Sequence, residues 1–495
     1  MVNKRIISLN VFFSLFQILV TGLAYYFLYK YLLNSVGPEL MGVWAIVLSI
    51  SSTANVANLG IGASVVRYTA TYKAKDEMYN INKLVHTSSL FLGAVFLIII
   101  LIVYLIAPFW LHAIISNKYY ANAMELVPFS LLCLFFNAMA GVFLSCIDGL
   151  QKNYLRSLLY IISFAFLIAM SYIYVPKYGL IGVAYAQLWQ AGFLLVSSII
   201  SLKFVLKEFN FFAFGWDKTI FKKIFSFGIQ EQIISICQLC FDPFTKSMLG
   251  SFGSLQMVTY YEMANRLVVQ LRGFLVSANQ VFIPVFAGFH EKSKDGTQRL
   301  YGQVFSINFL LSILWVSFII ASVVPVSIIW IRQINNPFIV ITVLLAFAYL
   351  TNIIMSPAYF ANMGSARLKE NVIGNIIIGI LNVVLCLTLG LFFNGYGVIT
   401  GWSVALAVGS LYILLKYHKE YNLHIKTLLT RKDMIICITG IFYGAGSFLF
   451  FYNNSYLNVW LMFGIDIFIF LLVCALVYKI HPVSKTLLNI IKKQK

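Results

Sequence analysis

Apolar stretches long enough to cross a membrane follow one another along almost the whole chain, from Ile6 to Tyr478. A helix needs about 20 predominantly apolar residues to cross a hydrocarbon core about 30 Å thick. Of the 495 residues, 61% are hydrophobic and only 10% are charged, far from the composition of a soluble domain. The chain is therefore predicted to be an all-α polytopic membrane protein. The fourteen predicted transmembrane helices cover residues 8–29, 41–62, 84–107, 124–147, 157–176, 181–202, 224–249, 257–283, 303–330, 338–360, 372–393, 398–415, 434–452 and 457–478.

The basic residues alternate between the two sides of these spans. With both termini in the cytoplasm, 28 of the 35 Lys and Arg fall on the inner connections and ends, and four fall on the outer ones. This distribution follows the positive-inside rule, which orients membrane helices. The net charge of +19 is thus explained by topology, and no nucleic-acid partner is expected.

The connections between the spans are short, and none is large enough to form a soluble catalytic domain. The chain has no G-x-x-x-x-G-K-[ST] sequence, so ATP is not expected to drive it. Its six histidines lack metal-ligand spacing, and its seven cysteines lie inside spans, where they resemble small apolar residues. We therefore expect neither a metal nor a cofactor, and place the function in or between the helices.

The chain also carries an internal repeat. The matching segments are "KYLLNSVGPELM" (30–41) with "KSMLGSFGSLQM" (246–257) at an offset of 216, and "GLQKN" (149–153) with "RLKEN" (367–371) and "YGLIG" (178–182) with "YGVIT" (396–400) at an offset of 218. Each repeat would contain six helices, and such parallel repeats build the two lobes of many transporters. The predicted organisation is an N-lobe (1–208), a pseudo-symmetric C-lobe (209–422), and two additional helices with a basic cytoplasmic tail (423–495).

The span 257–283 carries charges that its depth in the membrane makes costly. At 100° per residue, its polar side chains fall on one half of the helix. They are Glu262, Asn265, Arg266, Gln270, Arg272, Asn279 and Gln280. Glu262 and Arg266 have the spacing of an ion pair, whereas no carboxylate lies four residues from Arg272. An unpaired arginine in a membrane span indicates a functional site.

The preceding span, 224–249, shows a narrower polar band if the helix is continuous, although Pro243 is expected to kink it. The band comprises Glu231, Ser235, Gln238, Asp242, Thr245 and Lys246. Lys246 has two interpretations. It can pair with Asp242, or, because Lys30 matches it in the first repeat, it can extend to the headgroups as a snorkelling lysine.

The stretch "GPELMGVWAIVLSISSTANVANLGIGASVVRY" (37–68), together with two six-helix lobes and two further helices, resembles the Wzx-type flippases. These form the polysaccharide transporter branch of the MATE-like superfamily. The resemblance implies a V-shaped pair of lobes with a central cavity lined by spans 8–29, 41–62, 224–249 and 257–283. It also implies an undecaprenyl-diphosphate-linked sugar repeat unit as substrate, moved to the outer leaflet of the bacterial cytoplasmic membrane. A polysaccharide polymerase and membrane lipids are the implied partners.

With such a substrate, Arg266 and Arg272 are expected to bind the diphosphate, because an arginine fork grips phosphate oxygens at two points. Glu262 would hold Arg266 in position, and four amides could bind sugar hydroxyls. These amides are Asn265, Gln270, Asn279 and Gln280. Asp242 is the first candidate for coupling to H⁺ or Na⁺, with Lys246 as its supporting partner, and Glu231 is the second.

Two other classes of function compete with a flippase. A cation-coupled multidrug exporter of the MATE type would use acidic groups in its cavity, and Glu231, Asp242 and Glu262 are suitable. A membrane enzyme, such as a polysaccharide polymerase or ligase, would carry a sizeable outer loop with paired catalytic groups. No such loop occurs, so the sequence favours a transporter over an enzyme.

Overall fold

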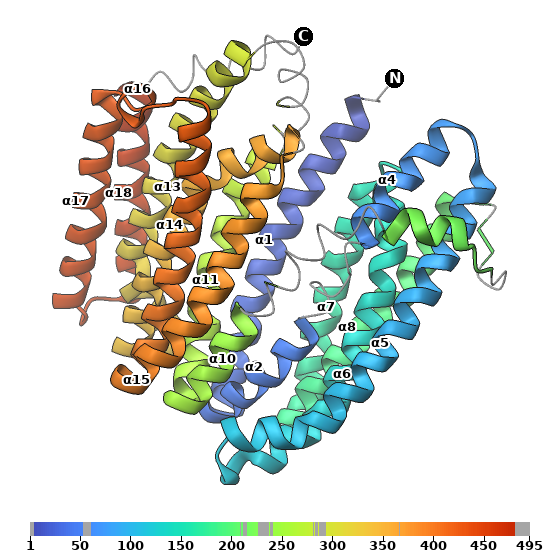
Figure 1. Cartoon of the computed structure of the whole chain (residues 1–495). Helices are drawn as coiled ribbons and strands as arrows, with labels where there is room; N and C mark the ends of the chain where they lie inside the picture. Colours follow the sequence, from blue (N-terminus) through green and yellow to red (C-terminus); the bar gives the residue numbers. More distant parts are fainter. Residues whose placement is uncertain are drawn as a thin grey trace. The chain divides into compact units, whose positions relative to one another are not determined.

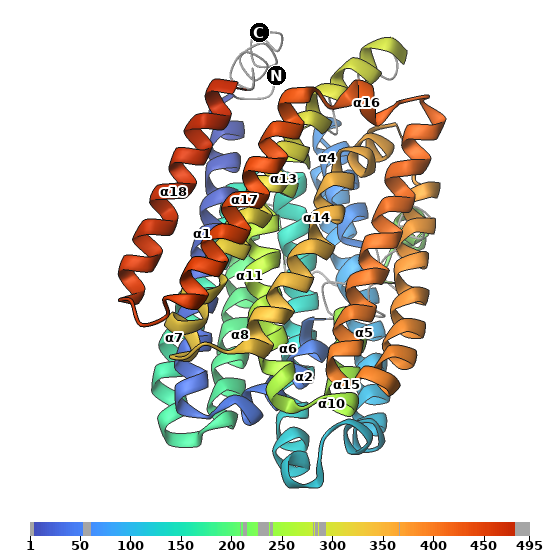
Figure 2. The same ribbon diagram turned by 90° about the vertical axis from the view of Figure 1, so that its left-hand side faces the viewer.

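The chain forms a helical protein, as the sequence predicts (Figures 1 and 2). The structure, a computed structural model, describes residues 4–52, 61–207, 209–210, 215–225, 237, 241–280, 282, 286, 294–365 and 367–480. No strand occurs in these residues. The helices are α1 (Lys4–Ser35), α2 (Pro38–Ser52), α4 (Ile61–Ala74), α5 (Met78–Ile114), α6 (Asn117–Gly149), α7 (Asn153–Tyr178), α8 (Leu180–Val205), α10 (Asp242–Phe252), α11 (Leu255–Gln280), α13 (Lys294–Ile331), α14 (Asn336–Gly364), α15 (Lys369–Glu420), α16 (Ile425–Leu428), α17 (Arg431–Asn453) and α18 (Val459–Ile480).

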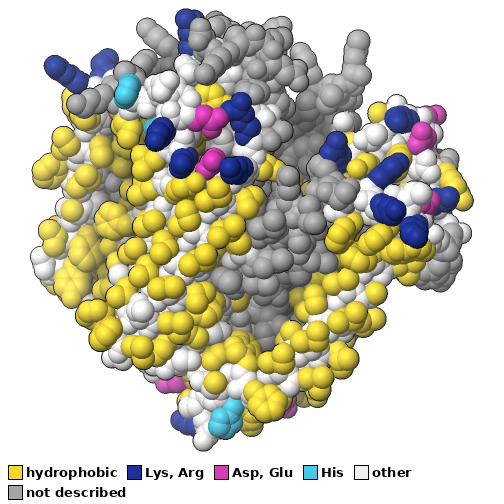
Figure 3. All heavy atoms as spheres, viewed as in Figure 1, with side chains coloured by type: hydrophobic (Ala, Val, Ile, Leu, Met, Phe, Trp, Pro, Cys, Tyr) yellow, Lys and Arg dark blue, Asp and Glu magenta, His cyan; other side chains and the backbone are white. Residues whose placement is uncertain are grey.

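Ten helices in the described part of the chain are long and apolar enough to cross a membrane. One of them, α15, contains two predicted spans, because Asn394 breaks its helical backbone at φ 53° and ψ −142°. Figure 3 shows hydrophobic side chains covering the helices, while the visible Lys and Arg gather mainly near helix ends. The protein is therefore a multi-pass membrane protein. The total of fourteen helices stays a prediction, since spans 41–62, 224–249 and 257–283 include residues outside the described part.

The chain divides into two compact units, Met1–Thr259 and Tyr260–Lys495. The first contains α1 to α10 and the first turn of α11, and the second contains the rest of α11 and α13 to α18. This division reflects how compactly the residues pack, whereas the lobes were predicted from the sequence repeat. The lobe boundaries at residues 208 and 422 therefore stay a prediction.

Backbone hydrogen bonds fix the register of the repeat in its first hairpins, α1–α2 and α10–α11. Val36 donates to the Leu32 carbonyl, as Gly253 does to that of Leu249. The starts of the next helices follow the same spacing, at Pro38 and at Leu255. The offset is thus 217, one residue more than the sequence match indicated.

This register corrects the comparison of Lys246 with Lys30. At 217 residues, Lys246 corresponds to Tyr29, and both side chains are buried, at 1% and 0% exposure. Lys246 does not extend to the headgroups, because its Nζ lies 2.6 Å from the Asp242 carboxylate and protein covers it. The snorkelling interpretation was wrong, and the ion-pair interpretation is confirmed.

The later hairpins, α7–α8 and the two parts of α15, give an offset of 215. Gly179 turns the chain at φ 56° and ψ −129°, and Asn394 does so at nearly the same angles. A Cβ atom on Gly182 would lie 2.5 Å from the Tyr174 carbonyl oxygen, and one on Gly397 would lie 2.0 Å from that of Leu389. The sequence match at 218 was wrong by three residues. A shift of three residues is close to one helical turn, so it brings residues of the same helix face into register. Similar residue types can therefore match at the wrong offset.

Candidate functional site

The predicted charges of α11 lie on a single helix in the second unit. Arg266 donates from Nε to Oε1 of Glu262 at 2.7 Å, one helical turn earlier. The Glu262 side chain is fully buried, whereas that of Arg266 is 30% exposed. The pair predicted from the spacing is confirmed. Burying a carboxylate is costly without a cation, so Arg266 neutralises Glu262, while part of the Arg266 side chain stays accessible.

Arg272 is held in a different way, by neutral groups of α14. Its Nε donates to Oδ1 of Asn352 at 2.8 Å, and its guanidinium lies 5.6 Å from the centre of the Tyr349 ring. Among the described residues, no carboxylate lies within ion-pair distance of Arg272. An amide and an aromatic face position the cation without cancelling its charge. Arg272 therefore supplies a net positive charge at this place in the helix.

A chain of amides and hydroxyls extends this arrangement between α11 and its neighbours. Asn352 donates to the Ser410 hydroxyl at 3.0 Å, and Tyr349 donates to Asn265 Oδ1 at 3.2 Å. Asn279 donates both amide hydrogens, to Asn308 Oδ1 at 2.6 Å and to the Ser356 hydroxyl at 2.7 Å. Buried polar groups that satisfy one another in this way hold helices at a fixed angle and depth. The network fastens α11 to α13 and α14, and α14 to α15.

The four amides predicted to face a sugar thus differ in their surroundings. Asn279 is buried and Asn265 is half-buried, and both contact other side chains of the second unit. Gln270 is half-buried and Gln280 is exposed. The polar half of α11 is consequently divided between an inward network and a more accessible set that includes Arg266 and Gln280.

The second charged pair lies at the start of α10. Phe241 leaves the helical conformation, with φ −95° and ψ −108°, and Pro243 stands in the first turn of the helix that begins at Asp242. The expected kink is therefore a helix start, and the assumption of a continuous polar band was wrong at this point. The side chain of Asp242 is 31% exposed beside the buried Lys246. Glu231 lies outside the described residues.

The two residues of α14 that contact Arg272 were not predicted from the sequence. Asn352 lies in the middle of the predicted span 338–360, where a polar amide is unusual, and Tyr349 precedes it by three residues. That spacing places both on one face of a helix. The polar pattern could have identified them as partners, although it could not have shown which charged helix they contact.

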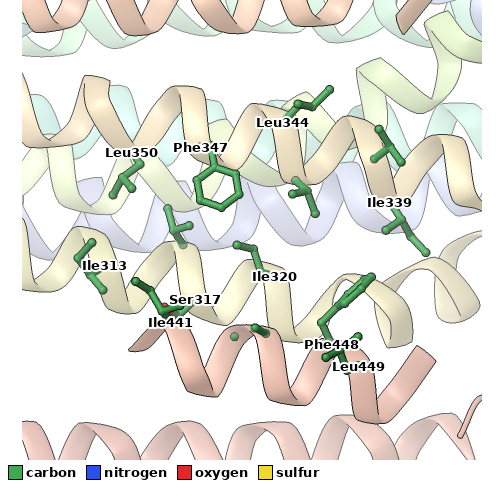
Figure 4. A pocket seen from close by; sticks show the side chains of 15 residues that line it. Ile313, Ser317, Ile320, Ile339, Leu344, Phe347, Leu350, Ile441, Phe448 and Leu449 are labelled. Carbon is green, nitrogen blue, oxygen red and sulfur yellow. The ribbon is translucent and has the colours of Figure 1, made fainter. Parts of the chain in front are cut away.

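An apolar cavity of about 570 Å³ lies among α13, α14 and α17. Figure 4 shows side chains from the three helices around it, including Ile320, Phe347 and Phe448. Ser317 is its only lining residue with a polar side chain, and the charged residues of α11 do not line it. Across the described part of the chain, no three His, Cys, Asp or Glu side chains group as metal ligands would.

Solved structures place this fold among known transporters. An inward-facing multidrug resistance MATE transporter of the MOP superfamily matches with a TM-score of 0.70 at 16% identity, over 80% of this chain and 94% of that one. The lipid II flippase MurJ, in an inward closed conformation, matches with a TM-score of 0.71 at 15% identity, over 95% and 99%. A MOP superfamily transporter from Pyrococcus furiosus, described as having a binding pocket of reversed polarity, matches with a TM-score of 0.58 at 15% identity, over 84% and 95%.

The chain therefore has the fold of this MATE transporter and of the lipid II flippase. The chain belongs to the polysaccharide biosynthesis protein family, whose model matches residues 8–290. No curated protein matches the chain in sequence.

Proposed function

We propose that this protein is a flippase for lipid-linked oligosaccharides. It moves an undecaprenyl-diphosphate-linked repeat unit from the inner to the outer leaflet of the bacterial cytoplasmic membrane, by alternating access, for surface polysaccharide synthesis. The polysaccharide biosynthesis family and the likeness to the lipid II flippase both support this assignment. The observation that carries it is Arg272, a cation held in a membrane helix by Asn352 and Tyr349 rather than by a carboxylate.

The chemistry of α11 suits a diphosphate. Arg266 and Arg272 are six residues apart, which is about 9 Å along a helix that rises 1.5 Å per residue. Two guanidiniums at this spacing can contact one diphosphate group together or in succession. Glu262 and Asn352 each accept from a single Nε, so each fork is oriented in advance. A diphosphate that leaves water would regain part of its hydration energy from these charges.

The amides of α11 extend the same proposal to the sugar. Gln270 and Gln280 are proposed to bind sugar hydroxyls directly, since Gln280 is exposed and Gln270 is half-buried. Asn265 and Asn279 are proposed to contribute mainly by holding the helix, because Tyr349 and Ser356 already bind them.

The test compares Arg266 and Arg272, each replaced by Lys and by Ala, in purified protein reconstituted at matched amounts. Binding and translocation of an undecaprenyl-diphosphate-linked oligosaccharide are measured. We expect Ala to reduce binding at least 10-fold and Lys to retain part of it, because Lys offers one point charge instead of a fork. Arg431→Ala, at the exposed start of α17, is the matched control and should bind as the wild type does. Wild-type binding by both α11 Ala variants would refute the site.

The MATE-like fold keeps a second candidate function, a cation-coupled multidrug exporter. The same vesicles distinguish the two functions. An exporter would move an organic cation, such as a fluorescent cationic dye, and would leave the lipid-linked oligosaccharide in its original leaflet. Arg272 favours the flippase, since a cationic drug would be repelled by an arginine that no carboxylate of the described residues neutralises.

The flippase requires an energy source, and we propose an H⁺ or Na⁺ gradient coupled through Asp242, with Glu231 as the second candidate. The ion pair with Lys246 gives Asp242 a partner that ion binding could displace. Asp242→Asn, compared at matched abundance, should reduce gradient-driven translocation and alter its dependence on pH or Na⁺. Unchanged transport and unchanged ion dependence would refute this role.

A further inference from the structure

The two C-terminal helices carry a polar pair that the proposed substrate site does not use. Helices α17 and α18 contact each other and lie side by side in both views (Figures 1 and 2). The Tyr443 hydroxyl on α17 donates to Oδ1 of Asp466 on α18 at 2.7 Å. Asp466 is fully buried, at 0% exposure, and Tyr443 is 6% exposed. A carboxyl group is thus enclosed where two apolar helices meet.

Among the residues that the structure describes, no positively charged side chain faces this carboxyl. Its other oxygen, Oδ2, has no hydrogen-bond partner among the residues that the structure describes. Tyr443 packs in an apolar cluster of α13, α17 and α18 that includes Leu314 and Val473. The ionisable groups facing the pair are Tyr443 itself and Cys474, which packs against the same cluster. On α13, no ionisable residue occurs between Tyr301 and Arg332.

The depth of Asp466 makes a negative charge costly there. It lies seven residues after Val459, where α18 begins, which corresponds to about 10 Å of helix. A charged Asp inside a membrane helix is costly, and a cation or several hydrogen bonds would be needed to offset that cost. Tyr443 gives only one hydrogen bond. A proton removes the charge altogether.

We propose that Asp466 is a proton-binding site, protonated at neutral pH while α18 is packed against α13 and α17, and able to release that proton. A metal cation is the less suitable ligand, since it requires a shell of several oxygens and this site presents one carboxyl and one phenol. Protonation allows the carboxyl and Tyr443 to form a neutral hydrogen-bonded pair inside the apolar cluster. Loss of the proton places a charge between three helices and loosens the packing of α18.

The site is independent of the proposed transport site. It lies on helices that have no counterpart in the predicted repeat, and no residue of α11 takes part in it. The proton acts here on the packing of α18 against α13 and α17 within the second unit. This would make transport sensitive to pH even if another carboxylate couples the gradient. The test below needs no substrate, so it succeeds or fails separately from the flippase assay.

The experiment is infrared spectroscopy of the full chain in phosphatidylethanolamine and phosphatidylglycerol vesicles, titrated from pH 5 to pH 10. We expect the wild type to show the C=O stretch of one protonated carboxyl at pH 7 that Asp466→Asn lacks, and this band should decrease as the pH rises. Asp76→Asn is the control, since Asp76 is exposed in the turn before α5 and has φ +60°, a conformation that Asn tolerates. It should leave the band intact.

Tyr443→Phe provides a second measurement that keeps the carboxyl in place. Loss of the phenol hydrogen bond should shift the same band to higher frequency without abolishing it. The proposal is overturned if the difference between wild type and Asp466→Asn at pH 7 contains only an ionised carboxylate. It is equally overturned if the protonated band stays constant up to pH 10, since the group would then be purely structural.

Discussion

Two hairpins, α1–α2 and α10–α11, have the same backbone hydrogen bond at the end of their first helix, 217 residues apart. Their side chains, however, differ in chemistry. In the first, Tyr29 packs its ring against Trp44 at 5.9 Å. In the second, the equivalent positions hold Lys246, paired with Asp242, and Tyr261. One backbone arrangement thus supports an aromatic contact in one copy and a half-buried ion pair in the other.

Further along the second helix of each hairpin, the contrast continues. Glu262 and Arg266 correspond to Ala45 and Ser49, so the first copy builds the same helix without charge. Charges that the fold does not need are expensive in a membrane and indicate function. The contrast therefore supports the proposal that the charged residues of α10 and α11 have a specialised role.

The two hairpins also contact each other in a symmetric way. Gly42 on α2 approaches the backbone carbonyl of Leu255, and Thr259 on α11 donates its hydroxyl to the carbonyl of Pro38 at 2.6 Å. At the offset of 217, Gly42 corresponds to Thr259 and Pro38 corresponds to Leu255. The two helices therefore approach each other at two equivalent positions. At one, the lack of a side chain on Gly42 allows the approach, and at the other, Thr259 forms a hydrogen bond.

The largest effect is expected from breaking the ion pair on one side only. Arg266→Ser removes the cation that neutralises a fully buried Glu262, and breaking a buried pair costs about 3 kcal/mol or more. The double change Glu262→Ala with Arg266→Ser installs the pair found in the first copy, and should recover most of that loss. Thermal unfolding of the purified variants in detergent measures both. A double variant no more stable than Arg266→Ser would mean that the two hairpins are not interchangeable.

A smaller loss is expected from Gly42→Ala. The added Cβ atom would lie 2.0 Å from the Leu255 carbonyl oxygen, so the two helices must separate, at a cost of about 1 to 3 kcal/mol. Gly192→Ala on α8 is the matched control, because nothing lies within 4 Å of its Cβ position and Ala favours a helix. The control should unfold at the wild-type temperature or slightly above it. Equal stability of the two alanine variants would disprove the close approach.

The smallest effect is expected from Thr259→Val, which keeps the shape of the side chain but removes its hydrogen bond. The loss should be about 1 kcal/mol, since the half-buried Pro38 carbonyl loses that donor. Thr388→Val is the control, because this hydroxyl is bonded only within its own helix and is exposed. If both sides belong to one crossing, combining Thr259→Val with Gly42→Ala should cost less than the sum of the two. If the two stability losses add strictly, the contacts of Gly42 and Thr259 are energetically independent.

The sequence determined the features that depend on local composition. Helices, membrane class and the pairing of Glu262 with Arg266 follow from apolar length and from spacing along one helix, because neighbours at i and i+4 meet in any helix. The predicted span 257–283 and the observed α11, Leu255–Gln280, agree within three residues at each end. A repeat was also evident, because duplicated turns retain similar residues.

Only the tertiary structure decided which helix faces meet. Sequence matches placed the repeat at offsets of 216 and 218. Hydrogen bonds at helix ends place it at 217 in the first hairpins, and the backbone angles of the turns place it at 215 in the later ones, because turns keep the register while side chains change. The burial of Lys246, the hold of Asn352 on Arg272 and the contact of Tyr443 with Asp466 all depend on how helices distant in sequence are rotated against one another. The sequence places a lone aspartate, Asp466, in the apolar stretch of α18, but no role was predicted for it. Its burial and its missing cation were set by packing, because the free energy of a membrane carboxyl depends on what neighbouring helices place beside it.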